Sequence, residues 1–296
     1  MTCLNRRTLL AGLGTCLLTG PLLAQGRLAT PSGFTGQVII NEGSGVRLHT
    51  YLADLQGSLV TSHVIEGPSA LIVVDAQFTP TSARELRTYV DSIGKPVERL
   101  ILSHQHPDHW FGVHHFGPMP VHAGPVTASF ISEAAAQLVD ELGADSSAPE
   151  VGGTIPEGSQ EIAGVTLNFR HVLDTEAPEM LVIEVPAVGA VIVQDLVYNR
   201  VHAVVSRQID SWVTALQDLE TQAGQSPLIL AGHGEPASPA DLGSMIDYLT
   251  AVKPLLESNI GNPEEAETIT DEIAAAFPDY RMPQLLTFGL SRALAQ

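Results

Sequence analysis

The sequence predicts an α/β fold, and three features of the chain support this prediction. Short apolar runs typical of strands alternate with segments of helical spacing between residues 46 and 231. The run Leu71–Val74 consists only of aliphatic residues, which is typical of a strand buried on both faces in a sheet that helices cover. With 296 residues, of which 44% are hydrophobic, the chain contains enough apolar material for a large core.

The first 24 residues have the composition of a signal peptide and are not expected to belong to the fold. Arg6 and Arg7 precede the apolar run Ala11–Leu23, which is too short to span a membrane. Adjacent arginines followed by leucines resemble a twin-arginine signal, and a plain Sec signal is the alternative. We therefore expect the twin-arginine export machinery as a partner, a periplasmic or secreted location and no stable membrane anchor. Residues 25–45 are expected to form a disordered lead.

The cysteine content argues against disulfides and thiolate metal ligands, and the charge argues against nucleic-acid binding. The only cysteines, Cys3 and Cys16, lie in the predicted signal peptide, so the mature protein would have neither a disulfide nor a thiolate metal ligand. The chain carries 33 acidic residues against 14 Lys and Arg, which gives a formal net charge of −19. Such an acidic protein repels nucleic-acid phosphates. We expect no nucleic-acid partner and instead a small-molecule substrate.

The first half of the mature chain predicts a sheet with covering helices. Strands are expected at Val46–Ala53, Ser58–Glu66, Ala70–Val74, Val97–Leu102 and Pro120–Ala123, and helices at Pro80–Ile93 and Val126–Leu142. The first helix has a threonine before Pro80 as its N-cap and Gly94 at its end. Residues 144–164 are rich in Gly, Ser, Pro and acidic residues without periodicity. They predict a long loop, which is either a lid over the site or a disordered insertion.

The second half predicts a further set of strands followed by helices. Strands are expected at Val165–Val172, Met180–Val185, Ala190–Gln194 and Pro227–Ala231, and helices at Ile209–Ala223, Leu242–Leu256 and Ile269–Phe277. The apolar residues of Ile209–Ala223 lie on one helical face, so we expect Trp212 in the core.

The most specific motif follows the predicted strand Val97–Leu102. Four metal-capable side chains occur within six residues, namely His104, His106, Asp108 and His109. Side chains two residues apart on an extended backbone point the same way, so His104 and His106 can bind one ion together. Pro107 ends the extended run, which turns Asp108 and His109 in another direction. They can therefore hold a second ion close to the first.

The pattern His-x-His-x-Asp-His resembles the signature of the metallo-β-lactamase superfamily. The resemblance extends from about Val46 to Gly234, because further ligand candidates follow in the order of the family. It implies a four-layer αββα sandwich with the site at the ends of strands. Residues 46–238 would form this domain, and residues 239–296 would form a C-terminal helical segment packed on it.

The resemblance also implies the other ligands. Most relatives carry a histidine in a Gly-His-Thr turn where this chain has Thr175-Glu176-Ala177-Pro178, which is similar to the ligand loop of the alkylsulfatase branch. Glu176 is therefore the expected third ligand of the first ion, with Asp174 as the alternative and His171 as a less favoured one. Asp195, directly after an apolar strand, matches the position that bridges both ions, and His233 matches the last ligand.

The implied ligand set has two groups. One ion is assigned to His104, His106, Glu176 and Asp195, and the other to Asp108, His109, Asp195 and His233. Asp75, at a neighbouring strand end, is expected to orient a ligand. Four further histidines could line the pocket, but surface or outer positions are expected for each: His114, His115, His122 and His202.

This ligand set predicts a dinuclear zinc hydrolase. Four imidazoles and three carboxylates suit two Zn²⁺ ions per chain, although Fe or Mn can occupy such sites. The ions would lower the pKa of water and polarise the substrate, and the resemblance makes Asp108 the catalytic residue that takes or delivers a proton. We expect an ester, lactone or sulfate-ester substrate, and β-lactams are disfavoured. The alternatives are an iron-dependent oxidoreductase on the same scaffold, similar to sulfur dioxygenases, and a binding protein with a structural metal.

Overall fold

The computed structural model describes residues 26–119, 121–142, 145–223 and 227–295. The predicted signal peptide, residues 1–24, lies outside the described residues, as does residue 25. Every helix within the described ranges is too short or too polar to cross a membrane.

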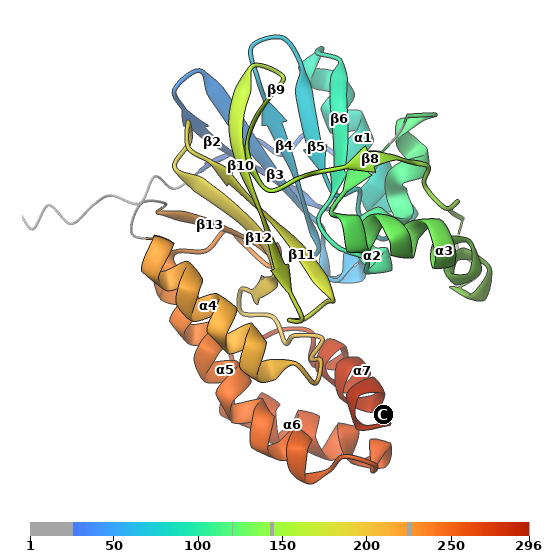
Figure 1. The fold of residues 1–296 in the computed structure, drawn as a ribbon, viewed down its shortest axis with the longest axis vertical. Coiled ribbons are helices and arrows are strands. Elements are labelled where there is room, and N and C mark those ends of the chain that lie inside the picture. Colours follow the sequence, from blue (N-terminus) through green and yellow to red (C-terminus); the bar gives the residue numbers. More distant parts are fainter. Residues whose placement is uncertain (1–25, 120, 143–144, 224–226, 296) are drawn as a thin grey trace, which may run out of the picture.

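Two β-sheets lie face to face in the centre of the molecule (Figure 1). The first sheet has eight strands in sequence order: β1 (Arg27–Leu28), β2 (Gln37–Gly43), β3 (Val46–Leu52), β4 (Thr61–Glu66), β5 (Leu71–Val74), β6 (Val97–Leu102), β7 (Val121–Ala123) and β8 (Val151–Thr154). The second sheet has five strands in the order β13-β12-β11-β10-β9, with bounds β9 (Gly158–Ile162), β10 (Val165–Leu173), β11 (Glu179–Val185), β12 (Ala190–Tyr198) and β13 (Leu228–His233).

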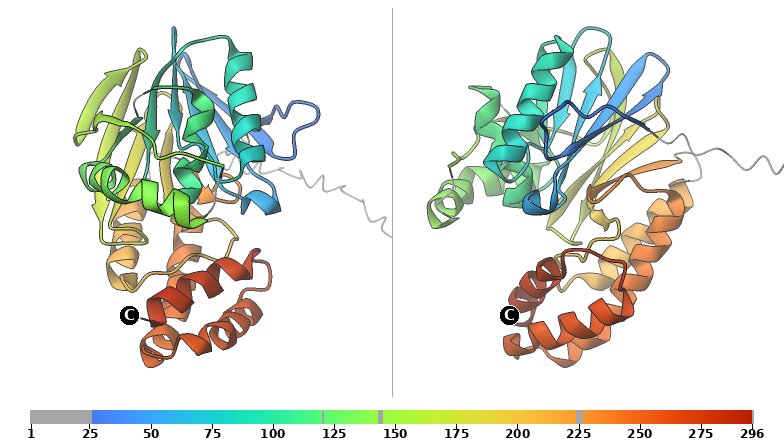
Figure 2. Two further views of the ribbon diagram at one scale, coloured as in Figure 1. Left: turned by 90° about the vertical axis from the view of Figure 1, so that its right-hand side faces the viewer. Right: turned by 180° about the vertical axis from the view of Figure 1, so that it is seen from behind.

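Helices form the two outer layers (Figures 1 and 2). α1 (Pro80–Ile93) and α3 (Pro125–Leu142) cover the first sheet, and α4 (Ile209–Ala223) and α5 (Pro239–Ser258) cover the second. The short α2 (Pro107–Trp110) lies at the end of β6, and α6 (Ala266–Ala276) and α7 (Pro283–Leu294) follow α5. The predicted α/β fold is thus confirmed, with helices outside two packed sheets.

Alternating side chains of the central strands hold the layers together. Val64 and Val73 face the helical layer that contains α1, whereas their neighbours Ile65 and Ile72 face the second sheet. This alternation is the pleat of a strand buried on both faces. Each such fully buried aliphatic side chain stabilises the fold by about 1.5–3 kcal/mol. On the far side, Trp212 of α4 is 0% exposed and packs in the apolar cluster of the second sheet, as expected.

Local signals at α1 and α2 act as the sequence indicated. The side chain of Thr79 accepts a hydrogen bond from the backbone N–H of Ser82, and Gly94 ends α1 with a φ of 76°. His106 still has extended dihedrals, and α2 begins at Pro107. The proline therefore converts the extended run into a helical turn, as predicted.

Two regions that were expected to be irregular contain strands. Residues 25–45 were expected to be a disordered lead, but β2 pairs with β3 along its whole length, from Gln37 opposite Leu52 to Gly43 opposite Val46. The prediction was wrong for the described residues 26–45. Val38 and Ile40 are buried at alternate positions, and this short alternation is the signal that the expectation overlooked.

The expected loop at residues 144–164 contains β8 and β9. β8 pairs with β7 at the edge of the first sheet, and β9 pairs with β10 at the edge of the second. Both strands are mostly exposed or half-buried, so they carry no apolar alternation that a sequence could reveal. This segment passes from one sheet to the other, and its interpretation as one long loop was wrong.

The tail after residue 238 is helical, with α7 in addition to the two helices expected. Leu242, Met245 and Leu286 belong to the same apolar cluster as Trp212 and Leu196. The tail helices and the second sheet therefore share one core. The division of the chain at residue 238 stays a prediction.

Candidate metal centre

The seven predicted ligands meet at one end of the two sheets. His104 and His106 follow β6, Asp108 and His109 lie on α2, Glu176 lies between β10 and β11, Asp195 lies in β12 and His233 ends β13. β5, β6 and β7 are parallel to one another, as are β12 and β13, so their carboxyl ends meet at shared edges. The fold thereby brings together side chains that are up to 129 residues apart, from His104 to His233.

The first group consists of His104, His106, Glu176 and Asp195. His106 Nδ1 lies 3.1 Å from Glu176 Oε1, and His104 Nε2 lies 3.7 Å from Asp195 Oδ2 and 4.0 Å from Glu176 Oε2. One donor atom from each residue lies within 4.8 Å of the others. These four side chains therefore enclose a volume in which one ion could contact all of them.

The second group consists of Asp108, His109, Asp195 and His233. His109 Nε2 lies 3.1 Å from Asp195 Oδ1, and His233 Nε2 lies 3.3 Å from Asp108 Oδ2 and 3.4 Å from Asp195 Oδ2. Their donor atoms also lie within 4.8 Å of one another. Asp195 belongs to both groups, and a single carboxylate can give one oxygen to each of two ions.

Hydrogen bonds fix which nitrogen of each buried imidazole faces the centre. Ser103 Oγ lies 2.6 Å from Asp75 and 2.9 Å from His104 Nδ1, so the single hydroxyl proton goes to the carboxylate and the imidazole donates. His233 Nδ1 donates to the backbone carbonyl of Ser58 at 2.8 Å, and His109 Nδ1 contacts Asp75 Oδ2 at 2.9 Å. The Nε2 atom of all three rings therefore faces inward as a potential ligand.

The atoms that face the centre fit divalent metal ions. Five of them are buried without a hydrogen-bond partner: His104 Nε2, His109 Nε2, His233 Nε2, Glu176 Oε2 and Asp195 Oδ1. Buried polar atoms are normally paired, so a cluster of unpaired donor atoms indicates a ligand site. Imidazole nitrogens and carboxylate oxygens at these positions are typical ligands of Zn²⁺ and of other first-row metals.

The charged groups of the centre strongly shift one another's pKa. Burial disfavours charge, but the carboxylates of Asp195 and Asp108 outweigh it and raise the pKa of His233 to about 10. They also raise the pKa of His109 well above its usual value, and Glu176 raises that of His106 to about 9. His104 differs, since burial and the neighbouring His109 lower its pKa to about 3. Metal ions must therefore compete with protons for this centre.

Tyr198, which the sequence did not single out, and Gly232, which precedes His233, complete the centre. The hydroxyl of Tyr198 donates to Asp195 Oδ2 at 2.7 Å, and its ring stacks on His233 at a centroid distance of 4.6 Å. Gly232 allows Asp195 to approach, because a Cβ at this glycine would lie 1.8 Å from Asp195 Oδ1. Tyr198 follows Asp195 by three residues in a buried strand, and nothing in its sequence context distinguishes it from a core residue.

The alternatives to Glu176 lie away from the two groups. Asp174 is exposed at a left-handed turn with a φ of 54°. His171 Nδ1 contacts Glu179 Oε1 at 2.8 Å, and its Nε2 bonds to the carbonyl of Ile155 at 3.0 Å. Glu179 also accepts a hydrogen bond from the backbone of Thr127 in the first turn of α3. Among the candidates for the third ligand, only Glu176 therefore has its carboxylate in the first group.

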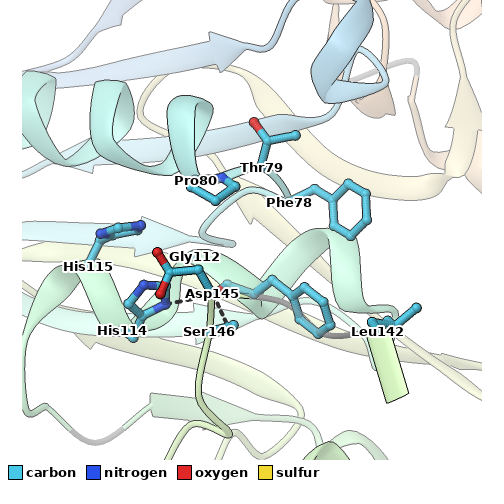
Figure 3. Close-up of a pocket in the computed structure, with 10 residues that line it drawn as sticks. Phe78, Thr79, Pro80, Gly112, His114, His115, Leu142, Asp145 and Ser146 are labelled. Atoms are coloured by element: carbon cyan, nitrogen blue, oxygen red, sulfur yellow. Dashed lines mark hydrogen bonds between the residues drawn. The ribbon is translucent and has the colours of Figure 1, made fainter. Parts of the chain in front are cut away.

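His114 and His115 line a separate pocket (Figure 3). This pocket has a volume of about 270 Å³ and lies between the start of α1, the 3₁₀ turn after α2 and the end of α3. Phe78 and Leu142 lie at one end of the view, and the two histidines with Asp145 lie at the other. None of the seven candidate ligands, all of which the structure describes, lines it.

Comparison with known proteins identifies the family of this chain. A family model described as the metallo-β-lactamase superfamily matches residues 55–234. A metallo-β-lactamase family protein from Thermus thermophilus has a similar structure, with a TM-score of 0.65 at 16% identity over 84% of this chain and 91% of that chain. A metallo-β-lactamase from Pontibacter korlensis gives a TM-score of 0.55 at 19% identity over 72% of this chain and 99% of that chain. No curated protein matches the sequence.

At these identities the structural neighbours show the fold, and the family match carries the assignment. The resemblance to the alkylsulfatase branch at Glu176 stays a prediction. Because the match spans more than half of the chain and includes the His-x-His-x-Asp-His motif, the chain belongs to the metallo-β-lactamase superfamily and is a metal-dependent hydrolase of that superfamily.

Proposed function

We propose that this protein is an exported hydrolase that uses two Zn²⁺ ions to cleave an ester, lactone or sulfate ester. The observation that carries the proposal is Asp195, which belongs to both groups of donor atoms. Its Oδ2 lies 3.7 Å from His104 Nε2 in the first group, and its Oδ1 lies 3.1 Å from His109 Nε2 in the second. A site for a single ion would not need a carboxylate between two sets of imidazoles. The set His104, His106, Glu176 and Asp195 would hold the first ion, and Asp108, His109, Asp195 and His233 the second.

Two bound Zn²⁺ ions would lower the pKa of water toward neutrality and polarise the oxygen of the substrate. Asp108 is the carboxylate that can exchange protons with a substrate. Its side chain is 24% exposed, whereas those of Glu176 and Asp195 are 0% and 1% exposed. Neighbouring imidazoles keep its pKa below the usual value against the effect of burial, so it is available as a base.

Tyr198 contributes to the orientation of Asp195. Burial and the surrounding carboxylates raise the pKa of its phenol well above the usual value, so it stays protonated and donates to Asp195. A charge-assisted hydrogen bond of this kind fixes one carboxylate oxygen in place. The other oxygen, Oδ1, remains directed at His109.

The test combines metal analysis with a substrate panel. Purified protein supplied with Zn²⁺ should contain two ions per chain and hydrolyse at least one of a series of aryl esters, lactones, thioesters and sulfate esters. A chelator should abolish turnover, and added Zn²⁺ should restore it. Protein that retains no metal, or whose turnover is indifferent to chelation or to Asp108→Asn, contradicts the proposal. Bound iron together with substrate-dependent oxygen uptake would favour the oxidoreductase alternative.

Export rests on residues 1–24, whose paired arginines precede an apolar run. When a bacterium expresses the intact chain, we expect to recover the mature protein, without residues 1–24, from the periplasm or the medium. Replacing Arg6 and Arg7 by lysines should retain it in the cytoplasm if the twin-arginine route is used. Undiminished export of that variant would favour the Sec route.

A further inference from the structure

A glutamine occupies a backbone conformation that favours glycine directly before Asp195. Gln194 has a φ of 44° and is 0% exposed. It lies at an irregularity in the pairing of β12 with β13, where the register shifts on both sides of it. Glycine adopts this left-handed conformation freely, whereas a residue with a Cβ does so at a cost in free energy. The side chain of Gln194 must therefore provide something that glycine cannot.

That side chain joins the two sheets behind the metal centre. Its Nε2 amide contacts Asp75 Oδ2, and its Oε1 lies 3.0 Å from His63 Nε2. His63 Nδ1 in turn lies 3.1 Å from the hydroxyl of Thr50. All four residues are at most 1% exposed. Thr50 and His63 belong to the first sheet and Gln194 to the second, so the contacts cross the interface between the sheets.

The atom types of the bonded groups determine which one donates in each hydrogen bond from Thr50 to Asp75. The amide oxygen of Gln194 can only accept, so His63 Nε2 carries the proton. His63 Nδ1 then accepts from Thr50, and the amide nitrogen of Gln194 donates to the carboxylate of Asp75. The hydroxyl of Thr61 fits the same order, because it donates to the carbonyl of Ala231 at 2.6 Å and can accept from His63 at 3.3 Å. The donors from Thr50 through His63 to Gln194 therefore all point toward Asp75.

Asp75 is the residue on which these bonds converge, and it contacts a candidate ligand. Its Oδ1 accepts from the backbone N–H of Ser103 at 2.8 Å, and its Oδ2 accepts from Ser103 Oγ, Gln194 Nε2 and His109 Nδ1. Asp75 itself has a φ of 60°, so its backbone is also held in the left-handed region. With this many donors, the carboxylate has a single orientation, which fixes the ring of His109.

We propose that Gln194 is a positioning residue for the second ion, acting together with His63. The pair holds Asp75 in the orientation that directs His109 Nε2 at the centre, and it thereby sets the metal affinity of the group Asp108, His109, Asp195 and His233. This inference rests on the proposed dinuclear function. The simpler explanation is that Gln194 only stabilises the packing of the two sheets, and the two explanations predict different results for the same substitution.

Gln194→Gly distinguishes the two explanations, since it removes the side chain and relieves the strain of the left-handed backbone conformation. The measurement is a Zn²⁺ titration of metal-free full-length protein in competition with a chromophoric chelator, together with the Tm of the metal-free protein. If Gln194 positions Asp75, the affinity for the second ion should fall about tenfold, as for loss of other outer partners of metal ligands. The affinity for the first ion should change by a smaller factor, because Asp75 contacts His109 directly but reaches His104 only through Ser103. Substitution by Co²⁺ should show the same loss in the visible spectrum of the second ion.

Gln194→Met is the second variant, because it keeps the length of the side chain and the backbone strain but has no donor. It should show the same selective loss of the second ion. Ala163→Gly is the matched control, since Ala163 also has a left-handed φ, 53°, and is buried in the turn between β9 and β10. It should relieve strain without changing either affinity.

Equal affinities in both Gln194 variants and the unaltered protein overturn the inference, as does an equal loss at both ions. Failure of both variants to fold overturns it too, because it would assign Gln194 to the packing alone. If the unaltered protein binds fewer than two ions, the proposed function fails instead.

Discussion

The two halves of the metal centre differ in how their imidazoles are supported. His109 and His233 in the second group are 0% exposed, and their outer nitrogens bond to Asp75 and to the carbonyl of Ser58. In the first group His104 is also 0% exposed, and its outer nitrogen bonds to Ser103. The side chain of His106, by contrast, is 29% exposed and contacts Glu176 in the loop between β10 and β11. Both imidazoles of the second half are therefore fixed by buried partners, whereas the first half includes one half-buried imidazole beside a loop.

The largest effect is expected where the halves join, at Asp195. Asp195→Ala removes a ligand from both groups at once, so both ions should be lost or bound weakly. Loss of several kcal/mol of transition-state stabilisation by metal ions corresponds to a fall in kcat/KM of about 10³-fold or more. Metal analysis and steady-state kinetics measure this. Asp210→Ala is the control, since that carboxylate is 82% exposed and pairs with Lys253 at 3.2 Å. Comparable losses in both variants would argue against a shared ligand.

Glu176→Gln tests the first half alone. Replacing a direct ligand should reduce the affinity for one ion by more than the roughly 10–100-fold that the loss of an outer partner costs. The second ion should remain bound, since Glu176 is not in its group. Asp174→Asn provides the comparison, because Asp174 lies outside both groups and its variant should retain two ions. A loss of metal in Asp174→Asn instead would reverse the assignment of the third ligand.

The protons of the centre predict that the Tm of metal-free protein and the increase in Tm on adding Zn²⁺ change in opposite directions with pH. The pKa of His106 is raised to about 9 and that of His233 to about 10. A histidine whose pKa is higher in the folded than in the unfolded protein stabilises the fold while it is protonated. This contribution is complete below the unfolded-state pKa of about 6.5 and is lost as the pH rises through the folded-state pKa. Between about pH 7 and pH 10, the Tm of metal-free protein should therefore fall. The increase in Tm on adding Zn²⁺ should grow over this interval, because fewer protons compete.

Melting curves with a chelator and with Zn²⁺ at several pH values measure both trends. His106→Asn sharpens the comparison of the halves. In metal-free protein with this substitution, the part of the fall in Tm with pH that is due to His106 should disappear. A metal-free protein whose Tm is constant over this interval would contradict the proton assignment.

The smallest effect is expected for Tyr198→Phe. The ring stack on His233 would remain, but Asp195 would lose one donor. A hydrogen bond to a charged group contributes about 1.5–3 kcal/mol, so the free energy of unfolding should decrease by about that amount. kcat should fall less than in either ligand variant. Tyr248→Phe removes another buried hydroxyl, next to His202 and away from the centre, and should lower stability without changing kcat. Denaturant melts and kinetics distinguish the two.

The sequence predicted the parts of the molecule that depend on short-range patterns. The spacing of His104, His106, Asp108 and His109 around Pro107 is local, so its geometry could be anticipated. The apolar run of β5 and the capped helix α1 are local signals as well. Glu176, Asp195 and His233 were reached through the family resemblance, because nothing local brings them to the motif.

The remaining parts depend on contacts between distant segments. The carbonyl of Ser58 that supports His233 is a backbone atom, which no residue type can signal. Gln194 and Tyr198 gain their roles only when the fold brings β12 to the ends of β5 and β13. The edge strands β8 and β9 have exposed faces, so their pairing is decided by available partners rather than by their own composition.

The shared core of the second sheet and the tail has a consequence for cutting the chain. Besides packing on Trp212, the tail bonds to the segment after Tyr198, since the backbone N–H of His202 donates to the carbonyl of Arg281 and that of Arg281 donates to Arg200. A fragment that stopped at residue 238 would expose the apolar side of α4 and release this segment. The catalytic half of the sequence is therefore not expected to be a portable module, and an engineered fusion would have to retain the chain through α7.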